Sequence, residues 1–133
     1  MSRIVLDANI AVEWVMTEPA TAVGNAAWEA YAARGAIAPR LFWAESRNVV
    51  LKIARRLSLT DDVRAAAMAG LDELDVTLED EVRERTVLGF AIHHHLSVYD
   101  ALYLEIATRT GRSLATNDRA LRRAAEAEGV ALV

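Results

Sequence analysis

The feature that most constrains this fold is the alternation of short apolar runs with longer segments that repeat with the period of a helix. Strands are expected at residues 4–6, 36–38, 76–78, 113–116 and 130–133. Helices are expected at residues 8–15, 20–34, 40–56, 79–93 and 97–111, with two more beginning near residues 60 and 118. Because strands that alternate with helices form parallel sheets covered on both faces, we predict a three-layer α/β/α fold with a short central parallel sheet.

Length and composition favour one domain spanning residues 1–133, since 53% of the residues are hydrophobic and can form a substantial core. The chain has no cysteine, which excludes disulfides and thiolate metal sites and fits a reducing compartment. The apolar N-terminal segment is interrupted by Asp7 and Glu13, so it reads neither as a secretion signal nor as a membrane span. We therefore expect a cytoplasmic protein with no membrane partner.

The net charge of −4 argues against a general nucleic-acid coat held by counterion release. Any contact with RNA or DNA must therefore be local. Fourteen of the fifteen cationic residues are arginine, and Lys52 is the only lysine. Arginine suits carboxylate and phosphate groups of a partner or substrate, although an arginine-rich composition without a role is the alternative.

The segment from Ser97 to Asp118 contains two acids at positions that local rules assign to helix starts. Ser97 and Asp100 have the spacing of a capping box, which places Asp100 in the first turn of an apolar helix. Gly111 suits a left-handed cap at the end of that helix. Asp118 follows a short apolar run, so it lies where a strand gives way to a helix.

Asp7 also follows a predicted strand, and in a parallel sheet the carboxyl ends of the strands meet along one edge where ligands bind. Each aspartate alone is explained equally well as a helix cap. Glu45 is not a cap, because it borders an apolar stripe of its helix and needs a partner there. Carboxylates gathered at neutral pH repel one another unless they share a cation, so a bound cation is predicted.

With oxygen ligands only, the expected ion is Mg²⁺, with Mn²⁺ able to substitute. Such an ion lowers the pKa of a bound water and neutralises charge on a phosphate, which is the chemistry of phosphodiester cleavage.

Four short motifs resemble those of the PIN-domain ribonucleases, and the resemblance covers nearly the whole chain. The first is the opening strand with Asp7 and Asn9, and the second is the run from Pro39 to Leu51 that contains Glu45. The third is the segment 96–103 around Asp100, and the fourth is the segment 114–118 that ends at Asp118. The third is the most specific of the four.

The size of the chain and the residues of its four motifs resemble those of the VapC-type toxins of bacterial toxin-antitoxin pairs. That resemblance implies a Mg²⁺-dependent endoribonuclease, a homodimer, and a VapB-type antitoxin through which DNA is contacted only indirectly. It also implies that the catalytic and metal-binding acids are Asp7, Glu45, Asp100 and Asp118.

Asn9 and Thr116 resemble groups that orient a carboxylate or a metal-bound water, although each could equally serve only its local backbone. Asn48, one turn beyond Glu45, is a further candidate on spacing alone.

Two other groups of residues suggest chemistry but have simpler explanations. His93, His94 and His95 point in different directions from a helix, and their position at a helix C-terminus favours imidazolium without any metal. The three tryptophans at positions 14, 28 and 43 have apolar neighbours, so a core or interface position is preferred to base stacking.

Two rival functions remain. A receiver-like signalling domain also places acids and Mg²⁺ at a sheet edge, but it requires a lysine on a late strand, whereas Lys52 is in a predicted helix. The other rival is a PIN module that processes or binds RNA without an antitoxin.

Overall fold

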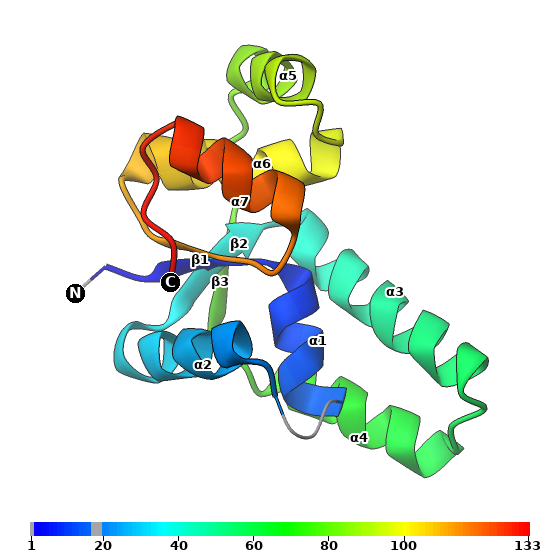
Figure 1. Cartoon of the computed structure of the whole chain (residues 1–133). Helices are drawn as coiled ribbons and strands as arrows, with labels where there is room; N and C mark the ends of the chain where they lie inside the picture. The colour runs from blue at the N-terminus through cyan, green and yellow to red at the C-terminus, as the bar shows by residue number, and fades with distance from the viewer. Residues whose placement is uncertain (1, 17–19) are drawn as a thin grey trace.

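The structure is a computed structural model that describes residues 2–16 and 20–133. Within these residues four parallel strands form one sheet in the order β3-β2-β1-β4. The strands are β1 (Ile4–Leu6), β2 (Ala36–Pro39), β3 (Val76–Glu79) and β4 (Leu114–Ala115). The predicted short parallel sheet is therefore confirmed (Figure 1).

Helices cover both faces of the sheet, as predicted (Figure 1). One face is covered by the helices that connect the first three strands: α1 (Ala8–Met16), α2 (Ala22–Arg34), α3 (Leu41–Arg56) and α4 (Asp61–Asp72). The other face is covered by α6 (Val98–Thr110) and α7 (Arg119–Ala127), with α5 (Glu84–His93) packed on α6. Proline suits the first turn of a helix, so Pro19 is expected to open the helix predicted at residues 20–34, but it lies outside the described residues.

The strand order creates a switch point between β1 and β4. From β1 the chain moves to β2 and β3 on one side, and then crosses back to add β4 on the other side of β1. In parallel sheets a ligand crevice forms where the connections diverge in this way, outside the carboxyl ends of the strands. Asp7 follows β1 and Thr116 follows β4, so both residues lie at this position.

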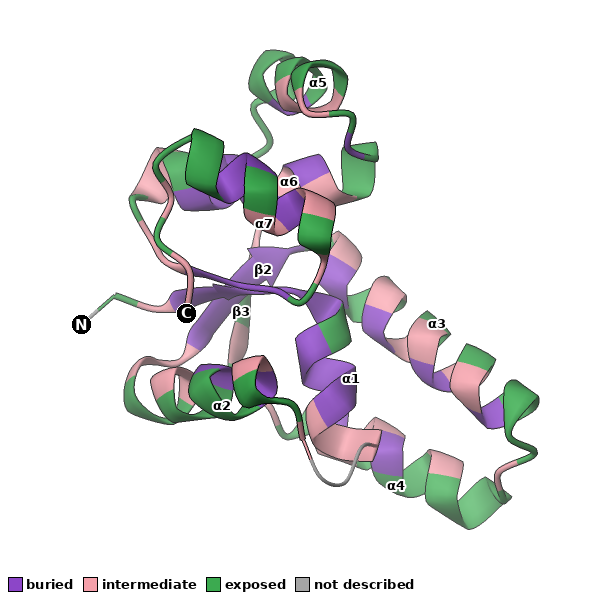
Figure 2. Ribbon diagram, viewed as in Figure 1, coloured by how far each residue is buried: buried purple, intermediate pink, exposed green. Residues whose placement is uncertain are grey.

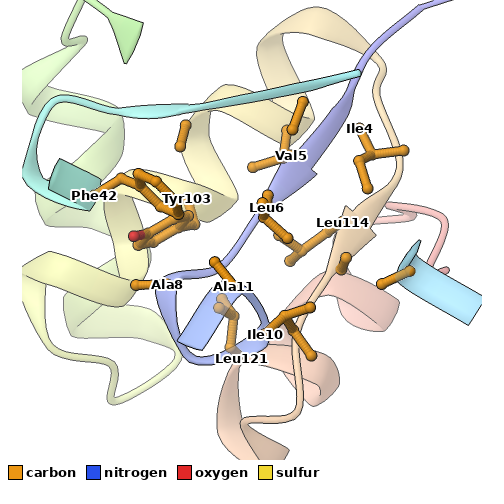
Figure 3. Packing of buried hydrophobic residues seen from close by; sticks show 14 of the residues in the cluster. Ile4, Val5, Leu6, Ala8, Ile10, Ala11, Phe42, Tyr103, Leu114 and Leu121 are labelled. Carbon is orange, nitrogen blue, oxygen red and sulfur yellow. The ribbon is translucent and has the colours of Figure 1, made fainter. Parts of the chain in front are cut away.

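The core explains why so short a sheet is stable. All residues of β1, β2 and β4 are buried, as expected for strands with helices on both faces. Figure 2 shows the buried residues concentrated in the sheet and the helix faces against it. Side chains from both layers join this cluster, including Ile10, Tyr103 and Leu121 (Figure 3).

Local sequence explains the ends of α6. The Ser97 hydroxyl accepts a hydrogen bond from the Asp100 N–H at 3.1 Å, and Gly111 has the left-handed conformation with φ of 68°. Six of the residues between them are buried: Ala101, Tyr103, Leu104, Glu105, Ile106 and Ala107. The predicted buried helix headed by Asp100 is confirmed.

Two predicted elements differ from the structure. The helix expected at residues 79–93 begins only at Glu84, because residues 76–79 pair with β2 and Glu81 forms an ion pair with Arg109. The apolar residues of an amphipathic helix are expected to face inward, which in this segment applies to Val82, Val87, Leu88 and Ile92. Only Val87 is buried, and the other three are exposed. Residues 130–133 form only an isolated bridge from Leu132 to Leu114 and no strand.

A buried ion pair holds the loop after β3 against α6. Glu105 is 2% exposed, and its carboxylate accepts from Arg109 Nε at 3.0 Å and from the Arg83 N–H at 3.2 Å. Arg109 also contacts Glu81 at 3.1 Å. The charge of Glu105 is thus paired and hydrogen-bonded, as a buried carboxylate must be.

None of the helices within the described residues has the length and hydrophobicity needed to cross a membrane.

Candidate active site

Asp7 is the most buried of the predicted acids, with 2% of its surface exposed. Its N–H continues the sheet by donating to the Ala115 carbonyl at 3.0 Å. Its Oδ2 accepts from the Thr116 hydroxyl at 2.7 Å, and the same hydroxyl accepts from the Asp118 N–H at 3.0 Å. Thr116, itself fully buried, therefore links the residues that follow two neighbouring strands.

The environment of Asp7 opposes its ionisation. Burial is the main cause, and the negative charges of Glu45 and Asp100 add to it, so that its pKa rises from 3.8 to about 7. The hydrogen bond from Thr116 and the backbone N–H of Asn9 act in the opposite direction but are outweighed. A nearby cation would strongly favour the ionised form of such a carboxylate.

Asp100 lies in the first turn of α6 and is half-buried. Burial raises its pKa first, and the charges of Asp118 and Glu45 raise it further against the hydrogen bond from Ser97. Asp118 is the N-cap of α7, where its Oδ1 accepts from the Leu121 N–H at 2.8 Å. Asp118 thus acts as a cap and also lies within electrostatic range of Asp100.

Glu45 is held by a tyrosine that the sequence motifs did not single out. The Tyr103 hydroxyl donates to Glu45 Oε1 at 2.7 Å, and Tyr103 is fully buried. Burial and then the charges of Asp7 and Glu45 raise the tyrosine pKa, so the hydroxyl stays protonated as a donor. Tyr103 lies one turn after Asp100 on α6, and this i,i+3 spacing was the available signal.

All four predicted acids therefore gather at the carboxyl edge of the sheet. The starts of α1, α3, α6 and α7 lie on this one side, as Figure 1 shows. The two predicted amides are less involved. Asn9 is exposed and its side chain makes no hydrogen bond within the described chain, and Asn48 is exposed on α3. An orienting role for the Asn9 side chain stays a prediction.

The donor set suits a hard divalent cation, because it consists of carboxylate oxygens whose charges raise one another's pKa at Asp7 and Asp100. Within the described residues no three acid or histidine side chains already converge on one point as metal ligands. Mg²⁺ keeps several waters and uses only one or two carboxylates directly, so a looser acid cluster fits it.

A second polar network beside the site was also missed. Glu13 is 8% exposed, and its carboxylate accepts from the Thr21 hydroxyl at 2.7 Å and from Asn117 Nδ2 at 3.0 Å. This contact fixes the loop between β4 and α7 against α1. A Cβ at Gly24 would overlap the Glu13 carboxylate, so a larger residue at that position would force Glu13 to move.

His94 lies away from Asp118, near the opposite end of α7. His94 caps the end of α5, and its Nε2 is 2.7 Å from Glu128, which caps the end of α7. Asp118 caps the opposite end of α7, about 15 Å away at 1.5 Å per residue.

Trp14 is partly buried and packs on Trp28 with ring centroids 5.1 Å apart, while Trp43 is 57% exposed.

The fold and site are those of an α/β protein with an acid cluster at the switch point of a parallel sheet. The chain belongs to the PIN domain family, whose model matches residues 4–127. PIN domains are generally nucleases, and their fold is that of metal-dependent nucleases. Lys52 lies exposed on α3, away from any strand, so the receiver-like alternative has no support.

One solved structure that resembles the chain is the crystal structure of PAE2754 from Pyrobaculum aerophilum. The TM-score is 0.68 and the sequence identity 26%, and the match covers 92% of this chain and 84% of that chain. No curated protein matches the sequence.

Proposed function

We propose that residues 1–133 act as one Mg²⁺-dependent endoribonuclease domain, the toxin of a type II toxin-antitoxin pair. The observation that carries the nuclease proposal is the cluster of acids around Asp7, whose charges and burial bring the Asp7 pKa to about 7. The residues that would hold the ion are Asp7, Glu45, Asp100 and Asp118. When bound, the ion would activate water and neutralise charge that develops on the phosphate.

The protein's own residues would prepare this site. Thr116 holds Asp7, and Tyr103 holds Glu45, each through a hydrogen bond of 2.7 Å. Asp118 is fixed by its bond to the Leu121 N–H. Side chains that are already oriented lose less entropy when substrate binds, which supports a catalytic arrangement rather than an incidental acidic surface.

The central test compares Asp100→Asn with Ser97→Ala. Asparagine preserves shape but removes the charge, so we expect RNA cleavage to be lost in a folded protein. Ser97→Ala removes the cap of the same helix but keeps the Asp100 carboxylate, so it should cost about 1 kcal/mol of stability while cleavage continues. Cleavage of labelled RNA would be followed with Mg²⁺, with Mn²⁺ and with EDTA. Full activity of folded Asp100→Asn would refute the nuclease site.

A groove beside the acids supports an antitoxin as partner. It has a volume of about 750 Å³ and is lined by Tyr99 and by apolar residues of α3, together with the polar side chains of Glu45, Arg47, Asn48 and Lys52. An antitoxin segment in this groove could place a basic side chain among the acids, which would exclude Mg²⁺ and phosphate together. Inhibition unchanged by excess Mg²⁺ and by loss of the partner's basic C-terminal residues would contradict this mode.

The exposed side of α5 supports the proposed homodimer. Ile92 is 77% exposed and Leu88 43% exposed, and Figure 2 shows α5 as largely exposed. Apolar side chains at such positions favour an interface between copies. Sedimentation of the wild type and of Ile92→Arg would test this, since the charged variant should be monomeric.

The alternative is a PIN nuclease that processes RNA without an antitoxin. A short adjacent gene whose product has a DNA-binding N-terminus and co-purifies with this chain would favour the toxin. Absence of such a gene would favour the alternative, and cleavage itself would be unaffected.

A further inference from the structure

We propose that Arg119, Arg122 and Arg123 on α7 form a phosphate-binding site that holds the RNA strand beside the bond to be cut. This inference rests on the proposed nuclease function and identifies a substrate-binding surface outside the acid cluster. Its main support is the position of these arginines directly after Asp118, the N-cap of α7.

The three arginines line one part of the α7 surface. Their spacing of three and four residues puts them on neighbouring positions of the helix surface. Within the described chain they line a single concavity of about 490 Å³. Arg122 follows Asp118 by one helical turn, a rise of roughly 5 to 6 Å, so the concavity begins where the acid cluster ends.

These cations are not neutralised by the protein. Several other arginines, including Arg47, Arg64 and Arg109, form ion pairs with acids. In the described part of the chain, no acid forms an ion pair with any of the three arginines of α7. The protein has a net charge of −4, and its four carboxylates repel an anionic RNA strand. A local cluster of unpaired cations beside them would offset this repulsion and allow the strand to approach.

Arg122 is also fixed relative to the acids. Its Nη1 donates to the Thr116 carbonyl at 2.8 Å, and the Thr116 hydroxyl holds Asp7. The remaining N–H groups of its guanidinium are available to a phosphate, which guanidinium can bind in bidentate fashion. Arg119 and Arg123 are exposed and can follow the strand. We therefore assign Arg122 as the fixed contact and the other two as adaptable ones.

An RNA strand fits this position better than an acidic protein segment does. If the scissile phosphate lies at the acids, the next phosphates of the same strand must cross an adjacent surface. The α7 surface is adjacent and cationic, and it contributes no base-reading aromatic side chain, so it would contact the backbone without regard to sequence.

The first experiment measures binding without cleavage, in an Asp100→Asn background. The double variant Arg119→Gln with Arg123→Gln, the α7 pair, is compared with Arg55→Gln with Arg56→Gln, the α3 pair. The α3 pair is exposed in the last turn of α3 and undergoes the same change of charge. Anisotropy of a labelled single-stranded RNA is recorded over a range of salt concentrations. We expect the α7 pair to bind about tenfold more weakly at low salt, with a log–log salt slope shallower by about 1.4 for two lost contacts. The α3 pair should bind almost as the parent does.

The second experiment replaces single phosphates of a cleavable RNA by neutral methylphosphonates. In otherwise unmodified protein, one or two positions on one side of the cut should reduce the cleavage rate. Those same positions should no longer matter in the α7 pair, because the contact is already lost. Equal losses in both proteins would overturn the assignment.

Failure of this inference is distinct from failure of the proposed function. If the wild type cleaves RNA but the α7 pair binds as the α3 pair does, the phosphate site is wrong and the nuclease stands. If no RNA is cleaved with Mg²⁺ or Mn²⁺, the function fails, and the binding comparison still decides the phosphate site. If the α7 double variant kept its affinity for RNA and lost affinity only for an acidic protein partner, the assignment of RNA to this surface would be wrong.

Discussion

Thr116 donates its hydroxyl hydrogen to Asp7 Oδ2 across 2.7 Å, although the two residues are 109 positions apart in the chain. They lie next to each other because β4 pairs with β1 in parallel, with Leu6 opposite Ala115. The same hydroxyl accepts from the Asp118 N–H. A single buried side chain thus connects two of the acids, and its hydrogen bond lowers the pKa of Asp7.

Replacing Thr116 by valine should raise the Asp7 pKa above about 7, because the hydrogen bond that opposes burial is lost. Asp7 would then ionise only at higher pH, so the acidic limb of the pH profile of cleavage should move to higher pH. Thr116→Ser keeps a hydroxyl and should restore the wild-type profile. Superimposable profiles for valine and wild type would show that this bond does not control the site.

The metal-free protein should lose stability as pH rises from about 4 to 7. In this window the unfolded chain has ionised Asp7 at its ordinary pKa of 3.8, while the folded chain still binds the proton, so deprotonation favours unfolding. The full shift corresponds to on the order of 4 kcal/mol as an upper limit. Urea unfolding in EDTA at several pH values would measure it.

The matched variant for that measurement is Asp7→Asn, which cannot ionise. Its stability should vary less with pH over the same window than that of the wild type, and Mg²⁺ should stabilise only the wild type strongly at pH 8. Identical pH dependence in the two proteins would place the effect elsewhere.

Tyr103→Phe should leave the ring buried but remove the donor to Glu45. We expect a loss of about 1–2 kcal/mol in the free energy of unfolding, since a charge-assisted bond is deleted. Cleavage should slow because Glu45 is no longer held, while RNA binding without metal should not change. Denaturant unfolding and single-turnover cleavage would be measured together. An unchanged cleavage rate would limit Tyr103 to a packing role.

The products should carry 5′-phosphate and 3′-hydroxyl ends. Attack by the RNA 2′-hydroxyl needs a general base, usually histidine, whereas His94 is paired with Glu128 at the far end of α7 from Asp118. An RNA with one deoxyribose at the cut should still be cleaved, and His94→Ala should be active. A 2′,3′-cyclic phosphate would contradict this and direct attention to His93, His94 and His95.

Several parts of the fold and site could be predicted from local sequence. Ser97, Thr60 and Gly111 each mark a helix end through a hydrogen bond or backbone conformation that involves only near neighbours. The buried strands followed from continuous apolar runs, and the parallel sheet followed from their alternation with helices. The positions of Asp7 and Asp118 after strands were therefore predictable before any contact was known.

The α5 region could not be predicted in this way. Glu79, Asp80 and Glu81 have the composition of a helix start, yet Glu79 pairs with Pro39 in the sheet and Arg109 of α6 binds Glu81. Likewise, apolar periodicity in α5 indicated an inward face, but that helix packs mainly on α6 and leaves Ile92 exposed. Long-range pairing outweighed local preference in both cases.

The sequence by itself determined where strands end, where helices begin and which acids stand at those junctions, because caps and apolar periods act over a few residues. The tertiary structure alone decided the partners of those acids. Tyr103 reaches Glu45 across 58 positions, and Thr116 reaches Asp7 across 109, because α6 packs over the sheet and β4 adds beside β1. The strong shift of the Asp7 pKa has the same origin, since burial and the charges of Glu45 and Asp100 exist only in the folded chain.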